Sequence, residues 1–243
     1  GDIYKGSVSA VLPSLQAAFI ELGLERTAFL QVKDMVEAEN ADGDEEGGRS
    51  RNGRRPRSFP PIQGLIKKGE EVLVQITKEP ISTKGARVTT QLALAGRFSV
   101  LMPNGSWVGV SRKITSFTER RRLRDLVREL RPNNNSIIVR TEGRNKTEKD
   151  FKRDLKQLVK TYERMIKKSK SAPAPSLLHK ELGMTTSVIR DLFNDRVDRL
   201  VVDSKDLYRE IQAYLKSVSP ELRKRVELFR ESRPIFDAFD VEK

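Results

Sequence analysis

Two phenylalanines and two basic residues have the types and spacing expected of a platform for single-stranded nucleic acid. Phe19 and Phe29 fall on consecutive predicted strands, and Lys84 and Arg87 lie at the turn into a later strand. An exposed aromatic face can stack on a base while a neighbouring cation meets the phosphate. The alternative is that both phenylalanines belong to the core, because most phenylalanines are buried. Spacing alone favours the core interpretation.

A second candidate is the pair Arg140-Thr141 at the end of an apolar strand. Arginine presents a planar fork of donors that can bind a terminal phosphate bidentately, and the threonine hydroxyl adds a neutral donor. The alternative is an ordinary strand-end arginine that pairs with Glu142, since most surface ion pairs have no special role. Without further information this second interpretation is favoured.

Residue types typical of metal binding or nucleophilic catalysis are sparse. The chain has no cysteine, and its one histidine, His179, lacks a cysteine, histidine or serine partner nearby in the sequence, so we expect a structural role for it. Asp191, Asp195 and Asp198 alternate with arginines, which favours a salt-bridged helix face over a metal cluster. A P-loop motif is absent from the sequence. We therefore expect no catalytic residue, no metal ligand and no cofactor in this chain.

Apolar, β-branched and aromatic runs predict the elements that hold the candidates. Five strands are predicted at 3–11, 17–20, 27–30, 72–77 and 86–92, separated by Pro, Gly and Ser turns. Five strands with one long loop match a small OB-type barrel. Further strands are predicted at 98–102, 107–110, 136–140, 199–202 and 226–229, and helices at 117–130, 149–166, 186–193 and 204–215. The fold class predicted is α+β and multi-domain.

Charge points to a polyanionic partner. The formal net charge is +13 and the pI is about 10.0, so nucleic acid is the leading candidate and an anionic membrane surface the weaker one. Residues 111–170 contain 20 Lys and Arg against 8 Asp and Glu, a clustering seen on RNA-binding faces, although a solvated helix face is the alternative. No stretch approaches the roughly 20 apolar residues needed to span a bilayer.

The segment from about 33 to 60 has a different character. It is acidic in its first half and basic in its second, with almost nothing apolar. Such a segment cannot bury enough surface to offset the entropy of ordering, which predicts a flexible loop. Its basic half could extend an RNA track. Because the chain starts at Gly1 and enters a strand pattern at once, we also expect it to be an excised fragment.

Several motifs, in order, resemble the ribonuclease E/G family. They cover essentially the whole chain apart from the loop: Tyr4-Lys5-Gly6, Leu15-Gln16-Ala17-Ala18-Phe19, Gly23-Leu24-Glu25-Arg26, Phe29-Leu30, KKGEEVLVQITKEPISTKGARVTT, LAGRFSVLMP, GVSRKI, IIVRTEG and HKE. The resemblance implies three domains. These are an OB-fold S-one type RNA-binding domain at 1–92 with its loop at 33–60, a 5′-sensor domain at 93–170, and a partial ribonuclease-H-like α/β domain at 171–243.

The resemblance also assigns site residues. In that family the positions of Phe19, Phe29 and Lys84 contact RNA. The positions of Gly96, Val100, Arg140 and Thr141 build a pocket for a 5′-monophosphate, in which the valine packs on the terminal base. With the resemblance, the pocket becomes the favoured interpretation of Arg140. Arg112 and Lys113 are expected to add to the RNA track.

What the family does as a whole is implied in the same way. The resemblance implies an endoribonuclease that acts on single-stranded RNA in RNA processing and messenger RNA decay, in the cytoplasm and as a homo-oligomer. The carboxylates that hold Mg²⁺ for cleavage would follow Lys243, so we expect this chain to bind RNA and sense its 5′ end without cutting it. The alternative is a non-catalytic module for single-stranded RNA, such as a ribosome-associated protein. No membrane contact is required.

Overall fold

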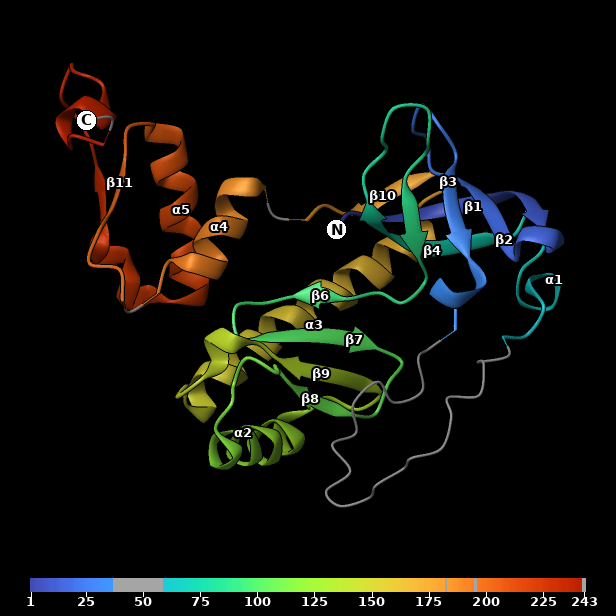
Figure 1. The fold of residues 1–243 in the computed structure, drawn as a ribbon, viewed down its shortest axis with the longest axis horizontal. Helices are drawn as coiled ribbons and strands as arrows, with labels where there is room; N and C mark the ends of the chain where they lie inside the picture. The colour runs from blue at the N-terminus through green and yellow to red at the C-terminus, as the bar shows by residue number, and fades with distance from the viewer. Residues whose placement is uncertain (37–58, 182, 195, 242–243) are drawn as a thin grey trace. The chain divides into compact units, whose positions relative to one another are not determined.

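The computed structural model describes residues 1–36, 59–181, 183–194 and 196–241, so most of the predicted loop at 33–60 lies outside the described residues. The chain separates into two compact units, Gly1–Glu181 and Leu182–Lys243. Each unit has its own core and is described by itself (Figure 1).

Five strands of the first unit close into a β-barrel. They are β1 (Ile3–Leu12), β2 (Ala17–Glu21), β3 (Ala28–Gln31), β4 (Glu71–Lys78) and β5 (Arg87–Thr89). Consecutive antiparallel pairs join β1 to β2 and β2 to β3, while β3 pairs with β5 in parallel. Antiparallel pairs of β5 with β4 and of β4 with β1 close the ring. The short α1 (Ile62–Leu65) leads into β4.

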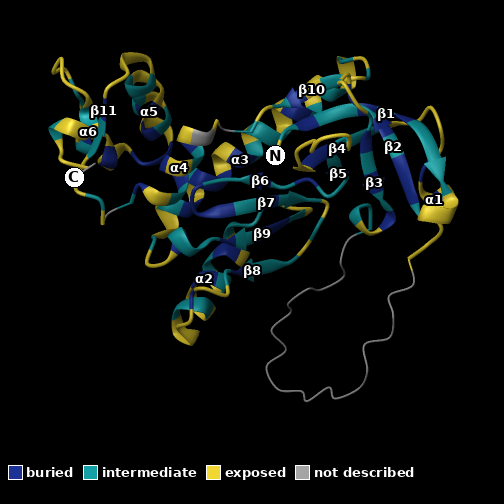
Figure 2. Cartoon of the chain, turned by 45° about the horizontal axis from the view of Figure 1, so that its top comes forward, coloured by how far each residue is buried: buried dark blue, intermediate teal, exposed yellow. Residues whose placement is uncertain are grey.

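Along the strands, side chains point alternately into the barrel and toward its surface. Ala18, Ile20, Ala28 and Leu30 are buried, whereas the residues between them on β2 and β3 are partly exposed. This period of two is what a strand with one face on a core requires. Figure 2 shows buried and intermediate residues along these strands. The predicted strands at 3–11, 17–20, 27–30, 72–77 and 86–92 are thus confirmed in substance.

A second sheet follows the barrel in the same unit. Its strands lie in the order β6 (Leu94–Ala95), β7 (Ser99–Pro103), β9 (Asn135–Val139) and β8 (Val108–Val110). Strands β8 and β9 are parallel, and the other pairs are antiparallel. The helices α2 (Phe117–Leu130) and α3 (Glu148–Ser171) pack on the sheet and share a core with it (Figure 1).

Each of the two helices begins at a residue that caps its N-terminus. The Ser116 hydroxyl accepts a hydrogen bond from the Glu119 amide at the start of α2, and Thr147 with Asp150 forms a capping box at the start of α3. Their apolar stripes, including the fully buried Leu123 and Phe151, face the sheet.

A strand that the sequence did not predict joins the barrel sheet. β10 (Ser176–His179) pairs antiparallel with the first residues of β1, with Ile3 opposite His179. Lys5 also reaches across, because its ammonium donates to the carbonyl of Ala172 at 2.9 Å. Residues that follow α3 are therefore built into the first unit.

The second unit is a smaller α/β arrangement. It contains α4 (Met184–Leu192), β11 (Leu200–Val202), α5 (Lys205–Val218), β12 (Val226–Leu228) and α6 (Ile235–Ala238). β11 and β12 form a parallel pair. The core gathers apolar side chains from both strands and from α4 and α5, among them Phe193, Ile211 and Leu215. The fold class α+β is confirmed, whereas the OB type, the ribonuclease-H-like character and the division at 92 and 170 stay predictions.

Candidate nucleic-acid interface

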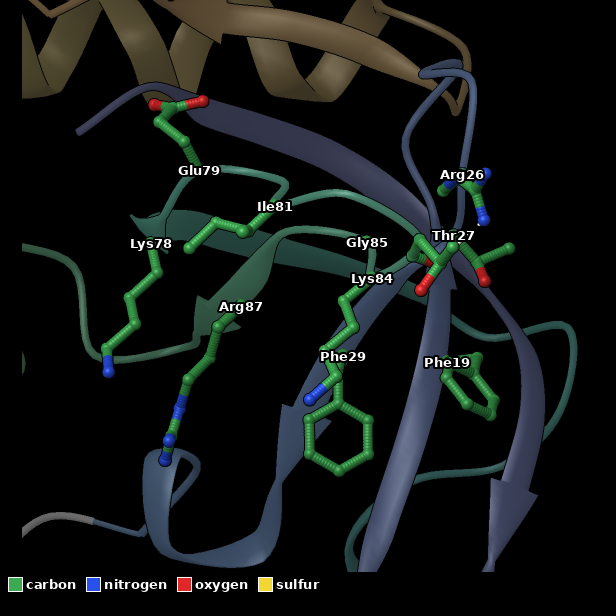
Figure 3. Close-up of a pocket in the computed structure, with 11 residues that line it drawn as sticks. Phe19, Arg26, Thr27, Phe29, Lys78, Glu79, Ile81, Lys84, Gly85 and Arg87 are labelled. Atoms are coloured by element: carbon green, nitrogen blue, oxygen red, sulfur yellow. Dashed lines mark hydrogen bonds between the residues drawn. The ribbon is translucent and has the colours of Figure 1, made fainter.

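A groove of about 660 Å³ opens on the outside of the barrel beside the β4–β5 hairpin (Figure 3). Aromatic, aliphatic and basic side chains share it. The lining residues are Phe19, Arg26, Thr27, Phe29, Lys78, Glu79, Ile81, Thr83, Lys84, Gly85 and Arg87. Phe19, Phe29 and Lys84, which are far apart in the sequence, are thus brought together in one place.

The two phenylalanines lie side by side on the outer face of the barrel. Phe19 on β2 and Phe29 on β3 are cross-strand partners, and their ring centroids are 5.8 Å apart at an interplanar angle of 56°. Both are partly exposed, because each lies between residues that point into the barrel. The expectation from spacing that they are core residues is therefore wrong. Two exposed, adjacent rings form a surface on which bases can stack.

A short hairpin holds Lys84 at the rim of the groove. Backbone hydrogen bonds pair Ile81 with Lys84 in both directions, and the Arg26 guanidinium donates to the Thr83 carbonyl at 2.7 Å. Gly85 is required here because a Cβ at this position would lie 1.9 Å from the carbonyl oxygen of Thr27. The Lys84 side chain is exposed, so its ammonium can meet a phosphate beside the rings.

Arg87 lines the groove, but its guanidinium is bonded to neighbouring residues of the barrel. Its guanidinium donates to the Asp34 carboxylate at 2.7 and 3.1 Å and to the Gln31 side chain at 2.9 Å. These contacts tie β5 to the end of β3. The cation is thus partly compensated before any ligand arrives.

The second candidate site lies where three strands of the second sheet meet. β8 and β9 run in parallel, so their carboxyl ends lie together, and β7 starts at the same edge. The Arg140 guanidinium donates to the Gly96 carbonyl at 2.8 Å, and the Thr141 hydroxyl lies 3.0 Å from the Ser111 hydroxyl. The structure therefore brings Gly96, Arg140 and Thr141 together. Val100 lies on β7 beside them and is partly exposed.

Arg112 and Lys113 directly follow Ser111 and are both exposed. The turn that carries them is held by Arg120 of α2, whose guanidinium donates to the carbonyls of Ser111 and Ile114 at 2.9 and 3.3 Å. The two basic residues therefore lie next to the hydroxyl pair of the second site, which concentrates positive charge there.

Asp154 organises this site, and the sequence did not single it out. The residue is 7% exposed, and its carboxylate accepts hydrogen bonds from the backbone amides of Arg97, Phe98 and Ser99 and from the Ser99 hydroxyl. A Cβ at position 96 would lie 2.7 Å from both carboxylate oxygens, so only glycine fits there. The signal in the sequence was a lone acid on the apolar stripe of α3, between Phe151 and Leu155.

Burial sets the electrostatics of that carboxyl. Removal from water raises the pKa of Asp154 above its usual value, and the hydrogen bonds from Ser99, Arg97 and Phe98 oppose this shift. The hydrogen bonds that the carboxyl accepts fix the backbone between β6 and β7.

Two further properties concern the described residues only. Within them, three or more His, Asp or Glu side chains do not gather at any point where they could hold a metal ion. Among the same residues, no helix is both long and apolar enough to cross a membrane.

Comparisons with known proteins agree with the motifs. A model of the Ribonuclease E/G family matches residues 93–243. Ribonuclease G of Escherichia coli (strain K12) is 35% identical over 243 residues, which cover 100% of this chain and 48% of the relative. Ribonuclease E of Haemophilus influenzae is 35% identical over 243 residues, which cover 99% of this chain and 25% of the relative. The chain spans about half the length of the ribonuclease G relatives that it matches.

Proposed function

The chain belongs to the ribonuclease E/G family, and we propose that it is the RNA-binding and 5′-monophosphate-sensing region of an endoribonuclease. The enzyme would act in RNA processing and messenger RNA decay. The observation that carries this proposal is the convergence of Arg140, Thr141 and the Gly96 turn at one sheet edge, because a barrel that only clamps RNA needs no such second site.

In this proposal the barrel, of OB type, clamps the single strand. Bases stack on the rings of Phe19 and Phe29, which are adjacent and partly exposed. Lys84 neutralises a phosphate at the rim of the same groove. Stacking tolerates any base, so this part would supply affinity rather than sequence preference.

The second site would read the 5′ end. A terminal monophosphate carries close to two negative charges and three acceptor oxygens. The Arg140 guanidinium donates to the Gly96 carbonyl, so its plane is oriented before the ligand binds. The Thr141 hydroxyl adds a donor, and Val100 packs on the terminal base. Arg112 and Lys113 then meet the phosphates that follow.

The activity of the whole protein belongs to the same proposal. By the family resemblance, cleavage would use Mg²⁺ held by carboxylates that are not among the site residues proposed here. A metal ion would supply charge neutralisation and an activated water for phosphodiester hydrolysis. The second unit would be part of a ribonuclease-H-like domain. The enzyme would be a cytoplasmic homo-oligomer, and no membrane contact is needed for this role.

The test compares two RNA ends on one protein. Fluorescence anisotropy measures binding of a short single-stranded RNA that bears either a 5′-monophosphate or a 5′-hydroxyl. We expect tighter binding of the monophosphate, and loss of that preference in Arg140→Ala. Arg121→Ala is the matched control, because Arg121 is an exposed arginine on α2. Equal binding of both ends by the unmodified chain would contradict a sensor in this chain.

The groove, taken without the second site, supports a second candidate function. The adjacent rings of Phe19 and Phe29 would suffice for a non-catalytic module that binds single-stranded RNA, such as a ribosome-associated protein. That function predicts equal affinity for the two RNA ends and no effect of Arg140→Ala beyond that of Arg121→Ala. The same titrations therefore separate the two functions.

A further inference from the structure

The second sheet has one face that the helices do not cover. Leu101, Ile137 and Val139 point toward α2 and α3 and are buried. The residues between them on the strands, Val100 and Ile138, point to the opposite face and are partly exposed. They are direct cross-strand partners, so they form a continuous apolar floor.

Trp107 extends this floor on the far side of Ile138. It directly precedes β8, and its backbone is fixed on β9, because its amide donates to the Ser136 hydroxyl at 3.2 Å and its carbonyl accepts from the Ile137 amide at 3.1 Å. Its ring lies over Gly109, where a Cβ would be 2.8 Å from Cζ3 of the indole. Trp107 remains partly exposed.

The backbone conformation at position 109 does not require glycine. Its φ is not positive, unlike those of Gly23 and Gly69. What its missing side chain provides is room for the indole of Trp107 to lie along the sheet next to Ile138. Partly exposed aromatic rings are the surfaces on which unpaired bases stack.

The ring of Trp107 lies on the same sheet as the second site. Strands β7, β9 and β8 place Val100, Ile138 and Gly109 in one row, and Arg140 follows Ile138 by two residues, about 6.6 Å along the strand. Arg112 and Lys113 come after β8, the strand that Trp107 precedes. An apolar row thus ends on one side at Val100 and on the other at the indole, with cations along its edge.

We propose that Trp107 is a stacking platform for the base of the second nucleotide of a 5′-monophosphorylated RNA. This inference rests on the proposed function, in which Arg140 and Thr141 hold the 5′-phosphate and Val100 packs on the first base. With the first base on Val100 and Ile138, the next base along the row meets the indole. The sensor therefore recognises a dinucleotide end rather than a phosphate alone.

Trp107 is the single tryptophan of the chain, so its fluorescence reports this contact directly. The 243-residue chain is titrated with 5′-monophosphorylated RNA that is intact, abasic at the second nucleotide, or abasic at the first. We expect quenching by the intact RNA that is lost when the second base is missing, with binding weakened about tenfold. Quenching that survives removal of the second base would overturn the proposal.

Substitutions at the ring complete the test. Trp107→Ala should weaken binding of intact RNA about tenfold, and removal of the second base should then have no additional effect. Trp107→Phe keeps an aromatic face and should bind almost normally. A thermal melt checks that each variant is folded, and the abasic RNAs need no substitution at all. Additive effects of Trp107→Ala and the missing base would contradict the stack.

The outcomes separate this inference from the proposed function. A preference for the 5′-monophosphate measured by anisotropy, together with fluorescence that ignores the second base, would overturn the stack and leave the sensor intact. Loss of the preference itself would contradict the sensor, whatever the fluorescence shows.

Discussion

The Asp154 carboxylate accepts hydrogen bonds from both the backbone amide and the hydroxyl of Ser99, at 2.9 and 2.5 Å. It thereby fastens α3 to the turn between β6 and β7. Gly96 lies in this turn, and its carbonyl anchors Arg140. A residue on a helix interior thus controls the orientation of a surface arginine without touching a ligand.

Replacement of Asp154 by asparagine should separate sensing from general RNA binding. The amide can accept at only one atom and brings donors toward the amides of Phe98 and Ser99, so the Gly96 turn loses its fixed geometry. We expect loss of the 5′-monophosphate preference with almost unchanged affinity for 5′-hydroxyl RNA. The stability measured by urea unfolding should fall by about 1–3 kcal/mol.

The matched control for that variant is Glu163→Gln, an exposed acid on the same helix. It should change neither the preference nor the stability. If Asp154→Asn keeps the preference in full, the turn is held by other contacts and Asp154 has no positioning role.

The rings on the barrel should contribute to affinity and little to stability. Phe19→Leu and Phe29→Leu each remove a stacking face that is partly exposed, so we expect a loss of about 1–3 kcal/mol of binding free energy for single-stranded RNA with either 5′ end. Phe117→Leu is the control, because Phe117 is 61% exposed and lies outside the groove. A loss in Phe117→Leu as large as in Phe19→Leu would argue for a nonspecific apolar effect.

Gly85 should tolerate no side chain. A Cβ would lie 1.9 Å from the Thr27 carbonyl oxygen, which is backbone and cannot turn away. Gly85→Ala should therefore separate the hairpin from β3 and destabilise the first unit by about 1–3 kcal/mol in urea unfolding. Gly64→Ala, whose Cβ would meet nothing within 4 Å, should leave stability unchanged or raise it slightly. Equal midpoints for the two variants would show that the Gly85 contact relaxes freely.

His179 should make stability fall on acidification. Burial lowers its pKa below the usual 6.5, an effect that the nearby Glu181 and Asp2 oppose and that Arg164 and the N-terminus reinforce. The unfolded chain therefore binds a proton at a pH where the folded chain does not. The stabilisation is present above about pH 6.5 and is lost as the pH falls through the lowered pKa.

Urea unfolding from about pH 8 to about pH 5 measures this dependence. His179 is the single histidine of the chain, so His179→Gln should flatten the curve over that range. An unchanged slope in the variant would assign the dependence to other groups.

The sequence predicted most strands and helices, because alternation and helical spacing are local properties. β10 was missed for the opposite reason. It has four residues, follows a proline-rich segment, and is stabilised by pairing with β1, a partner at the other end of the unit. No pattern within residues 176–179 reveals that pairing.

The candidate sites were predicted in part, from types of residue rather than from geometry. Arg140 and Thr141 stood out only through resemblance, since a strand-end arginine is usually unremarkable in a sequence. The spacing of Phe19 and Phe29 favoured a core position, and only the register of β2 with β3 shows both rings on the outside. Asp154 was absent from the candidates because a single acid on an amphipathic helix does not reveal what its oxygens accept.

The pairing of β10 with β1 has a consequence for the order of folding during synthesis. The Asp2 carboxylate accepts from the Glu181 amide at 2.8 Å, across 179 positions of sequence. The barrel can close through β1 and β4 once Thr89 has emerged from the ribosome. The outer edge of Ile3–Lys5 then remains unpaired until β10 has been synthesised. At about 5–20 residues per second, this takes roughly 5 to 20 seconds. During that interval the nascent chain presents an open strand edge to its neighbours.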